Sequence, residues 1–270
     1  MIDTVRMIIT RKCNLSCPYC HADAYNKLDL SKELSAKDWI DGLNKLPDLK
    51  KLIITGGEPL MSDVIDKTIE LVEYFTAKNV KVKINTNGTH MCIFDNVNPD
   101  DLEFQVSIDG LPLQHDKNRG KGNYKKSVNF IETQMSRGNK VKLKHVISSD
   151  NLYNINYVVS LAKKLMVQAQ FQVTVPIGRG KSYDSVENKD IINIIKSNGY
   201  DYRPRITTCY RHLGVGGITA SLDEYGNFIA CPQLRDFPTG LNITGDFTEQ
   251  EIRLRLKDIV GDMTCDTYTL

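Results

Sequence analysis

The segment Cys13-Asn14-Leu15-Ser16-Cys17-Pro18-Tyr19-Cys20 places three thiols within eight residues, in the spacing Cys-x3-Cys-x2-Cys. Three thiolates so close together can bind three irons of a cubane [4Fe-4S] cluster, and the fourth iron then stays open for a small ligand. A structural zinc site is the alternative interpretation. Zinc in such sites takes four ligands in a closed tetrahedron, whereas this segment offers three thiols with His21 directly against Cys20. The spacing therefore favours an iron–sulfur cluster.

The composition is that of a globular chain of mixed charge. Of its 270 residues, 41% are hydrophobic and 25% are charged, which suits one large domain with a small appendage. The net charge is +2 with both signs interspersed, so we expect no nucleic-acid partner. No apolar run approaches the ~20 residues that span a bilayer, so we expect no membrane partner.

Two further features favour the cytoplasm as the location. The first predicted strand begins almost at the N-terminus, which leaves no room for a secretory signal. The chain has seven cysteines, an odd number, and the first three are too tightly bunched for a disulfide framework. This cysteine usage fits metal ligation in a reducing compartment.

Hydrophobic periodicity predicts strands that alternate with helices. Strands are expected at residues 5–10, 51–55, 80–85, 102–108, 140–147 and 168–175. Helices are expected after a capping signal at 35–38, after Ser62, at 127–137 with Gly138 as the C-cap, and at 155–165. This rhythm predicts an α/β fold of parallel βαβ units, which closes into an open, partial (β/α)6 barrel. Ligands of such folds collect at the carboxyl ends of the strands.

Four motifs follow four of these strands. They are the cysteine segment, Gly56-Gly57-Glu58-Pro59, Thr86-Asn87-Gly88 and Ser107-Ile108-Asp109-Gly110. The cysteine spacing and the GGEP segment resemble the radical S-adenosylmethionine (SAM) superfamily, and the resemblance covers about residues 1–180. It implies the same partial barrel and a cluster that passes an electron to SAM. The 5'-deoxyadenosyl radical formed with methionine then abstracts hydrogen from an unactivated C–H bond. A reductase such as flavodoxin or ferredoxin is the implied electron donor.

The resemblance also assigns roles to the residues after the second and fourth strands. Gly56, Gly57, Glu58 and Pro59 match the segment whose backbone and acidic side chain receive the SAM ammonium; an ordinary strand-to-helix turn is the alternative. Ser107 and Asp109 resemble residues that touch the SAM carboxylate and ribose, although Asp109 can equally only shape the turn before Gly110.

The other expected cofactor contacts are less specific. Arg119 falls in a polar loop at 115–119, where it can pair with the SAM carboxylate or remain a solvated surface residue. Tyr19 is expected on the adenine side of the site, and the segment at 175–180, which includes Pro176, beside the adenine. Asn87, together with His145 and Val146 at the end of the fifth strand, is expected to line the SAM or substrate pocket.

The rhythm of the chain changes after residue 180. We expect a radical SAM barrel at 1–180, a linker with a short helix at 181–199, and a small domain at 200–270. That domain should hold strands at 217–223 and 227–231 around a tight turn, then a helix capped by Thr248.

The C-terminal cysteines resemble those of the SPASM and Twitch branch of the superfamily. Cys209, Cys231 and Cys265 flank a Gly-rich hairpin, as the ligands of an auxiliary [4Fe-4S] cluster do there. A full SPASM segment has several more cysteines, so the shorter Twitch form with one auxiliary cluster is implied. Its fourth iron takes a non-cysteine ligand or stays open for substrate. Three separate buried thiols are the alternative.

The reaction stays open in two respects. Cys92 matches no cluster position and is a structural thiol or a hydrogen donor to a substrate radical. A ribosomally made peptide that is cross-linked, oxidised or epimerised is the leading substrate. We expect no leader-binding winged helix before the first strand, which counts against a peptide unless a separate protein supplies that role. A small-molecule dehydrogenase or epimerase, acting on an amino sugar or a nucleotide-like compound, is the alternative. A non-catalytic metal-binding protein is a remote alternative. The GGEP segment argues against it, because such a protein has no need of an ammonium pocket beside an open iron.

Overall fold

The computed structural model describes residues 2–25, 27, 29–184, 186–197, 219–232 and 238–260. Its strands are β1 (Thr4–Ile8), β2 (Lys51–Thr55), β3 (Lys81–Thr86), β4 (Leu102–Ser107), β5 (Lys140–Ile147), β6 (Gln168–Val173), β7 (Thr219–Leu222), β8 (Asn227–Ile229) and β9 (Pro238–Asn242). Its α-helices are α1 (Ala36–Leu43), α2 (Ile65–Ala77), α3 (Pro112–Arg119), α4 (Asn123–Ser136), α5 (Asn154–Leu165), α6 (Asn188–Ser197) and α7 (Glu249–Val260). Short 3-10 helices form at Pro99–Asp101, Ser149–Asn151 and Gly178–Ser182.

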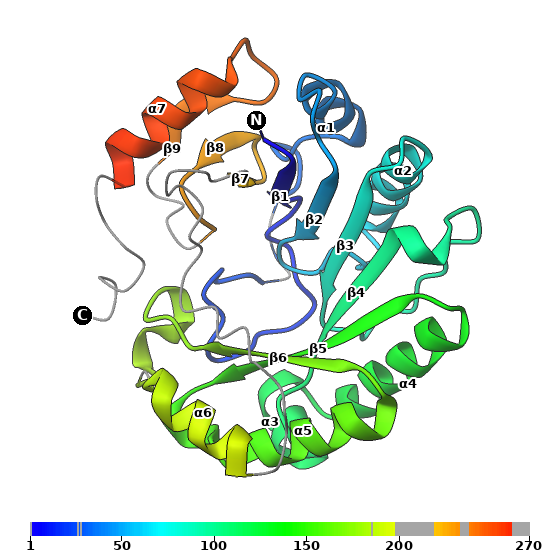
Figure 1. The fold of residues 1–270 in the computed structure, drawn as a ribbon, viewed down its shortest axis with the longest axis vertical. Coiled ribbons are helices and arrows are strands. Elements are labelled where there is room, and N and C mark those ends of the chain that lie inside the picture. Colours follow the sequence, from blue (N-terminus) through cyan, green and yellow to red (C-terminus); the bar gives the residue numbers. More distant parts are fainter. Residues whose placement is uncertain are drawn as a thin grey trace.

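The strands form one curved sheet in the order β6-β5-β4-β3-β2-β1-β7-β8-β9 (Figure 1). Neighbours from β1 to β6 all pair in parallel, with helices on the outer side of the curve. The predicted α/β partial barrel is confirmed. β2 and β5 also match their predicted ranges residue for residue, and burial alternates from one position to the next along the whole of each strand.

The two faces of the sheet differ in polarity. Side chains such as Leu52, Ile84 and Phe104 point outward and are fully buried against the helices. Burial of one such side chain contributes about 1.5–3 kcal/mol. The alternate positions point inward and are largely polar; we call the space that they enclose the lumen. The lumen-facing residues near its middle include Arg6, Thr55, Lys83, Asn85, Gln105, Lys144 and Gln172.

The C-terminal strands extend the same sheet. β7 pairs in parallel with β1, with Arg6 opposite Ser221, and β8 and β9 continue as antiparallel strands. The turn between β7 and β8 is held by Asp223, whose Oδ1 accepts the backbone N–H groups of Tyr225 and Asn227 at 3.0 and 2.8 Å. The predicted hairpin is confirmed, and the sheet runs without a break past the boundary expected near residue 200.

Two of the predicted helix starts are confirmed and one is wrong. Ser35 and Asp38 form a capping box at α1, and Thr248 forms the same reciprocal bonds with Glu251 at α7. Ser62 does not cap α2, which begins three residues later. Tight turns fill the interval, and the Thr68 hydroxyl of α2 donates to the Pro59 carbonyl at 2.6 Å.

Arg119 was predicted to lie in a loop, and that prediction is wrong: Arg119 is the last residue of α3. This helix starts at Pro112, a favoured first residue because its missing N–H would have no partner there. It has little amphipathic pattern, since Leu113 is 87% exposed, and that explains why periodicity missed it. Among the described residues, no helix is long and apolar enough to cross a membrane.

Candidate active site

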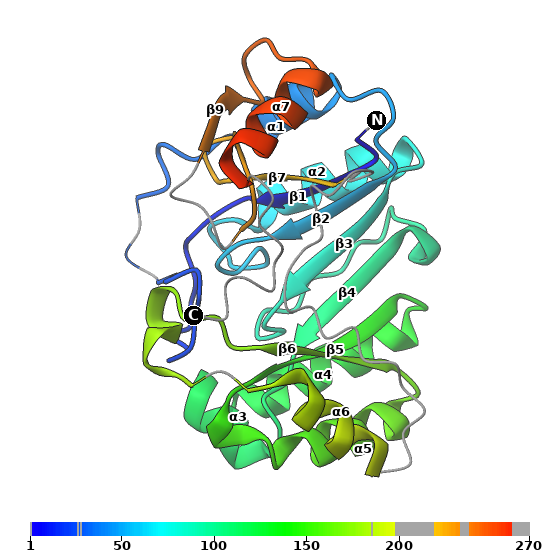
Figure 2. The same ribbon diagram turned by 60° about the vertical axis from the view of Figure 1, so that its left-hand side comes forward.

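The cysteine segment forms a loop at the carboxyl end of β1, on the open side of the sheet (Figure 2). We call residues 9–25 the cysteine loop. Cys13, Cys17 and Cys20 carry free thiols and border one cavity. The loop turns tightly, with the Cys20 N–H donating to the Cys17 carbonyl at 3.2 Å, and the Leu15 N–H donates to the Cys13 Sγ at 3.4 Å.

Arg179 ties this loop to the segment after β6. Its Nε donates to the Cys17 carbonyl at 2.9 Å, its Nη1 pairs with Asp23 at 2.7 Å, and its Nη2 donates to the Ala24 carbonyl at 2.8 Å. The Arg179 backbone N–H adds a bond of 3.0 Å to the Cys20 carbonyl. Sequence reasoning placed Arg179 only within the segment 175–180 expected beside the adenine and did not foresee this clamp, because its partners lie some 155 residues away in the chain.

The three thiols fit a [4Fe-4S] cluster better than a single zinc ion. A structural zinc site takes four ligands in a closed tetrahedron, whereas this loop presents three thiols around an open cavity. Three thiolates bind three irons of a cubane cluster and leave the fourth iron open. Burial raises the pKa of Cys13 to about 12 and raises that of Cys17, so the thiolates need nearby positive charge, which irons supply.

The GGEP turn packs its backbone directly against the cysteine loop. The Gly57 N–H donates to the Thr10 carbonyl at 2.7 Å, and the Glu58 N–H donates to the Lys12 carbonyl at 2.9 Å. A Cβ on Gly57 would lie 2.0 Å from that Lys12 oxygen, so only glycine fits. Gly56 and Gly57 border the cavity, and their contact with the SAM ammonium stays a prediction.

Glu58 has different contacts from those expected. Its carboxylate is fully buried and accepts bonds from the Thr86 hydroxyl and the Asn87 N–H, each at 2.7 Å, and from the Leu60 N–H at 3.0 Å. Burial raises the pKa of Glu58, while these bonds act in the opposite direction. The side chain therefore joins the GGEP turn to the turn after β3 and does not border the cavity, so its contact with the SAM ammonium stays a prediction.

Asp109 and Arg119 form a buried ion pair beside Tyr19. The Arg119 Nε lies 2.9 Å from the Asp109 Oδ2, and the Tyr19 hydroxyl donates to the same oxygen. Burial alone would raise the pKa of Asp109, but the charge of Arg119 outweighs it and the pKa is lowered. The Arg119 side chain is 7% exposed, which excludes the solvated surface alternative. Its observed partner is Asp109, and its expected pairing with the SAM carboxylate stays a prediction.

The structure brings most of the other predicted residues to the same cavity. Tyr19, Asn87, Ser107, Arg119 and Val146 border it together with the three thiols. Pro59 and Pro176 do not, and Pro176 is exposed on the surface. His145 points away from the lumen, where its ring meets Phe171 edge-on and its Nδ1 lies 3.0 Å from the Ile108 carbonyl.

The remaining cysteines fall in three different situations. Cys92 is buried outside the cavity, and its carbonyl accepts a bond from Gln134 at 2.7 Å, so its observed contacts are structural. Cys231 is buried just after β8, beside Pro232, which borders the lumen. Cys209 and Cys265 lie outside the described residues.

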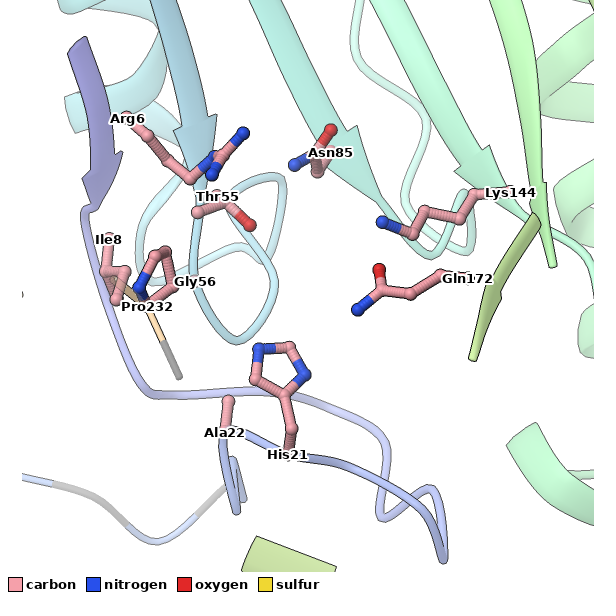
Figure 3. Close-up of a pocket in the computed structure, with 10 residues that line it drawn as sticks. All are labelled: Arg6, Ile8, His21, Ala22, Thr55, Gly56, Asn85, Lys144, Gln172 and Pro232. Carbon is pink, nitrogen blue, oxygen red and sulfur yellow. The ribbon is translucent and has the colours of Figure 1, made fainter. Parts of the chain in front are cut away.

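Sequence reasoning missed the deeper part of the site. Thr55, Asn85, Lys144 and Gln172 line the lumen below the thiols, and Figure 3 shows their polar ends directed into the same space as Arg6 and His21. A signal was present, because polar side chains occupy alternate positions of strands whose other positions are fully buried. In a sheet with helices on its outer face, such positions face the interior.

Comparison with known proteins points to one superfamily. The family model of the Radical SAM superfamily matches residues 7–159. GTP 3',8-cyclase of Clostridium perfringens (strain SM101) is 31% identical over 204 residues, which cover 72% of this chain and 62% of the relative. Mycofactocin maturase MftC of Mycolicibacterium smegmatis is 31% identical over 255 residues, covering 83% of this chain and 62% of the relative. The chain thus spans about three fifths of the length of these relatives.

Solved structures share the fold. Native anSMEcpe with bound AdoMet superposes with a TM-score of 0.67 at 18% identity, covering 95% of this chain and 82% of that chain. Streptococcus suis SuiB bound to precursor peptide SuiA gives a TM-score of 0.66 at 13% identity, covering 100% and 67%. The family match extends from β1 into α5 and covers more than half of the chain. Together with the thiols at the end of β1, it shows that this protein belongs to the radical SAM superfamily.

Proposed function

We propose that this radical SAM enzyme modifies a ribosomally made peptide by abstracting hydrogen from an unactivated C–H bond. The observation that carries the proposal is one continuous cavity, which runs from the three thiols of the cysteine loop into the polar lumen. A cofactor at the thiols and a substrate in the lumen would therefore share one space. The cluster, when bound, supplies the electron that cleaves SAM to methionine and the hydrogen-abstracting 5'-deoxyadenosyl radical.

The residues of the chain hold and orient the reactants. The glycine backbone at the GGEP turn and the Ser107 hydroxyl offer polar groups to the amino-acid end of SAM. Tyr19 is fixed by its bond to Asp109, and its ring packs against the Arg119 guanidinium, 5.8 Å from the ring centre. These contacts preorganise the site, so little reorganisation is needed when a ligand enters.

The peptide assignment is supported by the relatives. MftC is named a mycofactocin maturase, and the fold is shared with SuiB, which has been solved with its precursor peptide. A nucleotide-like small molecule is the second candidate. It is favoured by the similarity to GTP 3',8-cyclase and by the cationic side chains of the lumen.

An auxiliary [4Fe-4S] cluster on Cys209, Cys231 and Cys265 belongs to the same proposal. It would accept the second electron of an oxidation or orient the substrate through an open iron. Its support is the position of Cys231, which is buried after β8 beside a residue that borders the lumen. Flavodoxin or ferredoxin is the proposed electron donor.

The first experiment tests the radical chemistry. Anaerobically reconstituted protein should cleave SAM to 5'-deoxyadenosine with dithionite, and the Cys13/Cys17/Cys20→Ala variant should lose about four irons and this activity. Cys92→Ala is the matched control for iron content, because Cys92 lies outside the cavity. A triple variant that kept all of its iron would refute the assignment of the first cluster.

The second experiment tests the substrate and the auxiliary cluster. Wild-type protein is incubated with a candidate precursor peptide and, separately, with GTP, and mass spectrometry follows each for a change in mass. In the Cys209/Cys231/Cys265→Ala variant, product formed per SAM cleaved should fall sharply, provided that circular dichroism shows a folded chain. An unchanged ratio would remove the auxiliary cluster from the mechanism.

A further inference from the structure

The middle of the lumen carries a lysine with no partner. Lys144 lies on β5, facing inward, and its ammonium group points toward the centre of the cavity (Figure 3). Among the described residues this ammonium group makes no hydrogen bond and no ion pair. The side chain is half-buried, and an ammonium group partly removed from bulk water costs free energy unless an acceptor faces it.

The other lumen cations do have protein partners. Glu103, the carboxylate on the inward face of β4, lies 3.4 Å from the Lys83 Nζ and 2.8 Å from the Lys142 Nζ. The carboxylate is thus shared between Lys83 and Lys142, and neither of these ion pairs includes Lys144. The lumen therefore has an excess of positive charge around Lys144.

The surroundings of Lys144 oppose its charge. Burial in the lumen, then the nearby charges of Lys83 and Arg6, lower its pKa to about 7. A bound anion would reverse both effects, since it would accept the three ammonium donors and offset the neighbouring cations.

Neutral polar side chains also surround the Lys144 ammonium group in the lumen. Thr55, Asn85 and Gln172 direct their side chains into the cavity beside Lys144 (Figure 3). Side-chain amides and a hydroxyl can each donate a hydrogen bond to an oxyanion. The same residues border the cavity that the cysteine loop closes, so an anion here would lie on the lumen side of the proposed SAM site.

We propose that Lys144, with Arg6 and Gln172, binds an oxyanion of the substrate, either a carboxylate or a phosphate, in the lumen below the thiols. The inference rests on the proposed function and adds a substrate class to it. A peptide substrate would place an acidic side chain or a terminal carboxylate on Lys144. A nucleotide substrate would place a phosphate there.

The primary test measures protection of Lys144 from acylation. The reconstituted, SAM-loaded protein is labelled briefly with acetic anhydride at pH 6.5, digested, and analysed by mass spectrometry. The labelling is repeated with glutarate, with inorganic phosphate, and with sodium chloride at matched ionic strength. A bound anion that raises the pKa of Lys144 by one unit would lower its labelling up to about tenfold.

The arms of this test separate the sources of the anion. Protection by glutarate above that by phosphate indicates a carboxylate substrate, and the reverse indicates a phosphate. Lys125, exposed on α4, should be labelled equally in every arm. Labelling of Lys144 that neither anion changes beyond the chloride control would overturn the proposal. Labelling of SAM-free protein is compared with that of SAM-loaded protein as well. If SAM alone protected Lys144 as strongly as the better anion does, the proposal would be overturned, because Lys144 would then bind the cofactor and not the substrate.

Variants provide a second measurement by calorimetry of the better probe. Lys144→Met should weaken binding about tenfold or more, whereas Lys144→Arg should retain most of it. Lys125→Met is the control and should bind as wild type does. Neither measurement uses radical chemistry. If the protein bound the anion but did not cleave SAM, the proposed function would be contradicted. The anion site at Lys144 would still be supported.

Discussion

The mouth of the barrel and its lumen hold their polar groups in opposite ways. At the mouth, which comprises the cysteine loop, the GGEP turn and the Asp109–Arg119 pair, each charged side chain has a partner elsewhere in the chain, although the Asp109 Oδ1 accepts no hydrogen bond among the described residues. In the lumen, Lys144 and the Asn85 Oδ1 have no partner among the described residues. Satisfied groups fix a geometry, whereas unsatisfied groups await a ligand. The mouth therefore has the character of a cofactor scaffold, and the lumen that of a substrate site.

The strongest test of the mouth is Asp109→Asn. The substitution leaves the Arg119 guanidinium buried without its counter-charge, which typically costs about 3–5 kcal/mol. Chemical denaturation should show the loss as a lower midpoint.

Asp41→Asn is the matched control for this loss. Asp41 pairs with Lys37 on the surface of α1, where both side chains are more than half exposed, so the change should cost about 0.5 kcal/mol or less. If Asp109→Asn and Asp41→Asn lost equal stability, the buried Asp109–Arg119 pair would stabilise the fold no more than an exposed surface pair does.

Glu58→Gln should have an intermediate effect. The amide replaces one acceptor oxygen with a donor, so at least one of the three bonds to Leu60, Thr86 and Asn87 is lost, at a cost of about 1–3 kcal/mol. Calorimetric titration of SAM on the reconstituted protein would show whether binding weakens as well. Unchanged stability with weaker SAM binding would assign Glu58 to the cofactor instead.

Arg179→Met should act on the cysteine loop more than on the whole fold. The side chain is 27% exposed, so we expect a loss of about 1 kcal/mol in global stability. Hydrogen exchange in residues 13–25 should rise clearly, and cluster uptake should slow. Arg179→Lys is the comparison, since it keeps the charge but cannot reach the same carbonyls as a fork. Exchange equal to wild type would show that the loop holds its shape without this clamp.

The last prediction concerns the pH dependence of stability and the lumen. Because the pKa of Lys144 is lowered to about 7 in the folded chain, the unfolded chain binds more protons between pH 7 and about 10. This group thus makes the free energy of unfolding rise with pH in that window, and Lys144→Met should remove the rise. The charged groups around it are Lys83, Glu103, Arg6, Lys142 and His21. Parallel stability curves for the two proteins over this window would count against a lysine held at low pKa.

The sequence predicted those parts of the molecule that local pattern controls. Strands β2 and β5 and the caps at Ser35 and Thr248 follow from neighbouring residues alone. The helix α3 was missed because it buries few apolar side chains, and Ser62 was assigned as a cap because turns cannot be distinguished from a first helical turn by composition.

The site divides in the same way. The thiols and the GGEP glycines were identified because their spacing is specific. The partners of Glu58 and Asp109 depend on contacts between segments 28 to 90 residues apart, which one sequence does not reveal. Lys144 was missed because an alternating lysine in a strand ordinarily faces water, and only the closure of the sheet turns it inward.

The pairing of β1 with β7 has a consequence for the newly made chain. Residues 4–7, directly before the cysteine loop, pair with residues 219–222, so one edge of β1 stays open until residues 219–222 have been synthesised. At typical ribosomal speeds this interval lasts roughly 10 to 40 s. An unpaired edge is a template for association with other chains. Among the barrel strands that gain two neighbours, β1 to β5, the strand that presents the thiols is therefore the last to be enclosed, and chaperones or early occupation of the thiols would protect it during translation.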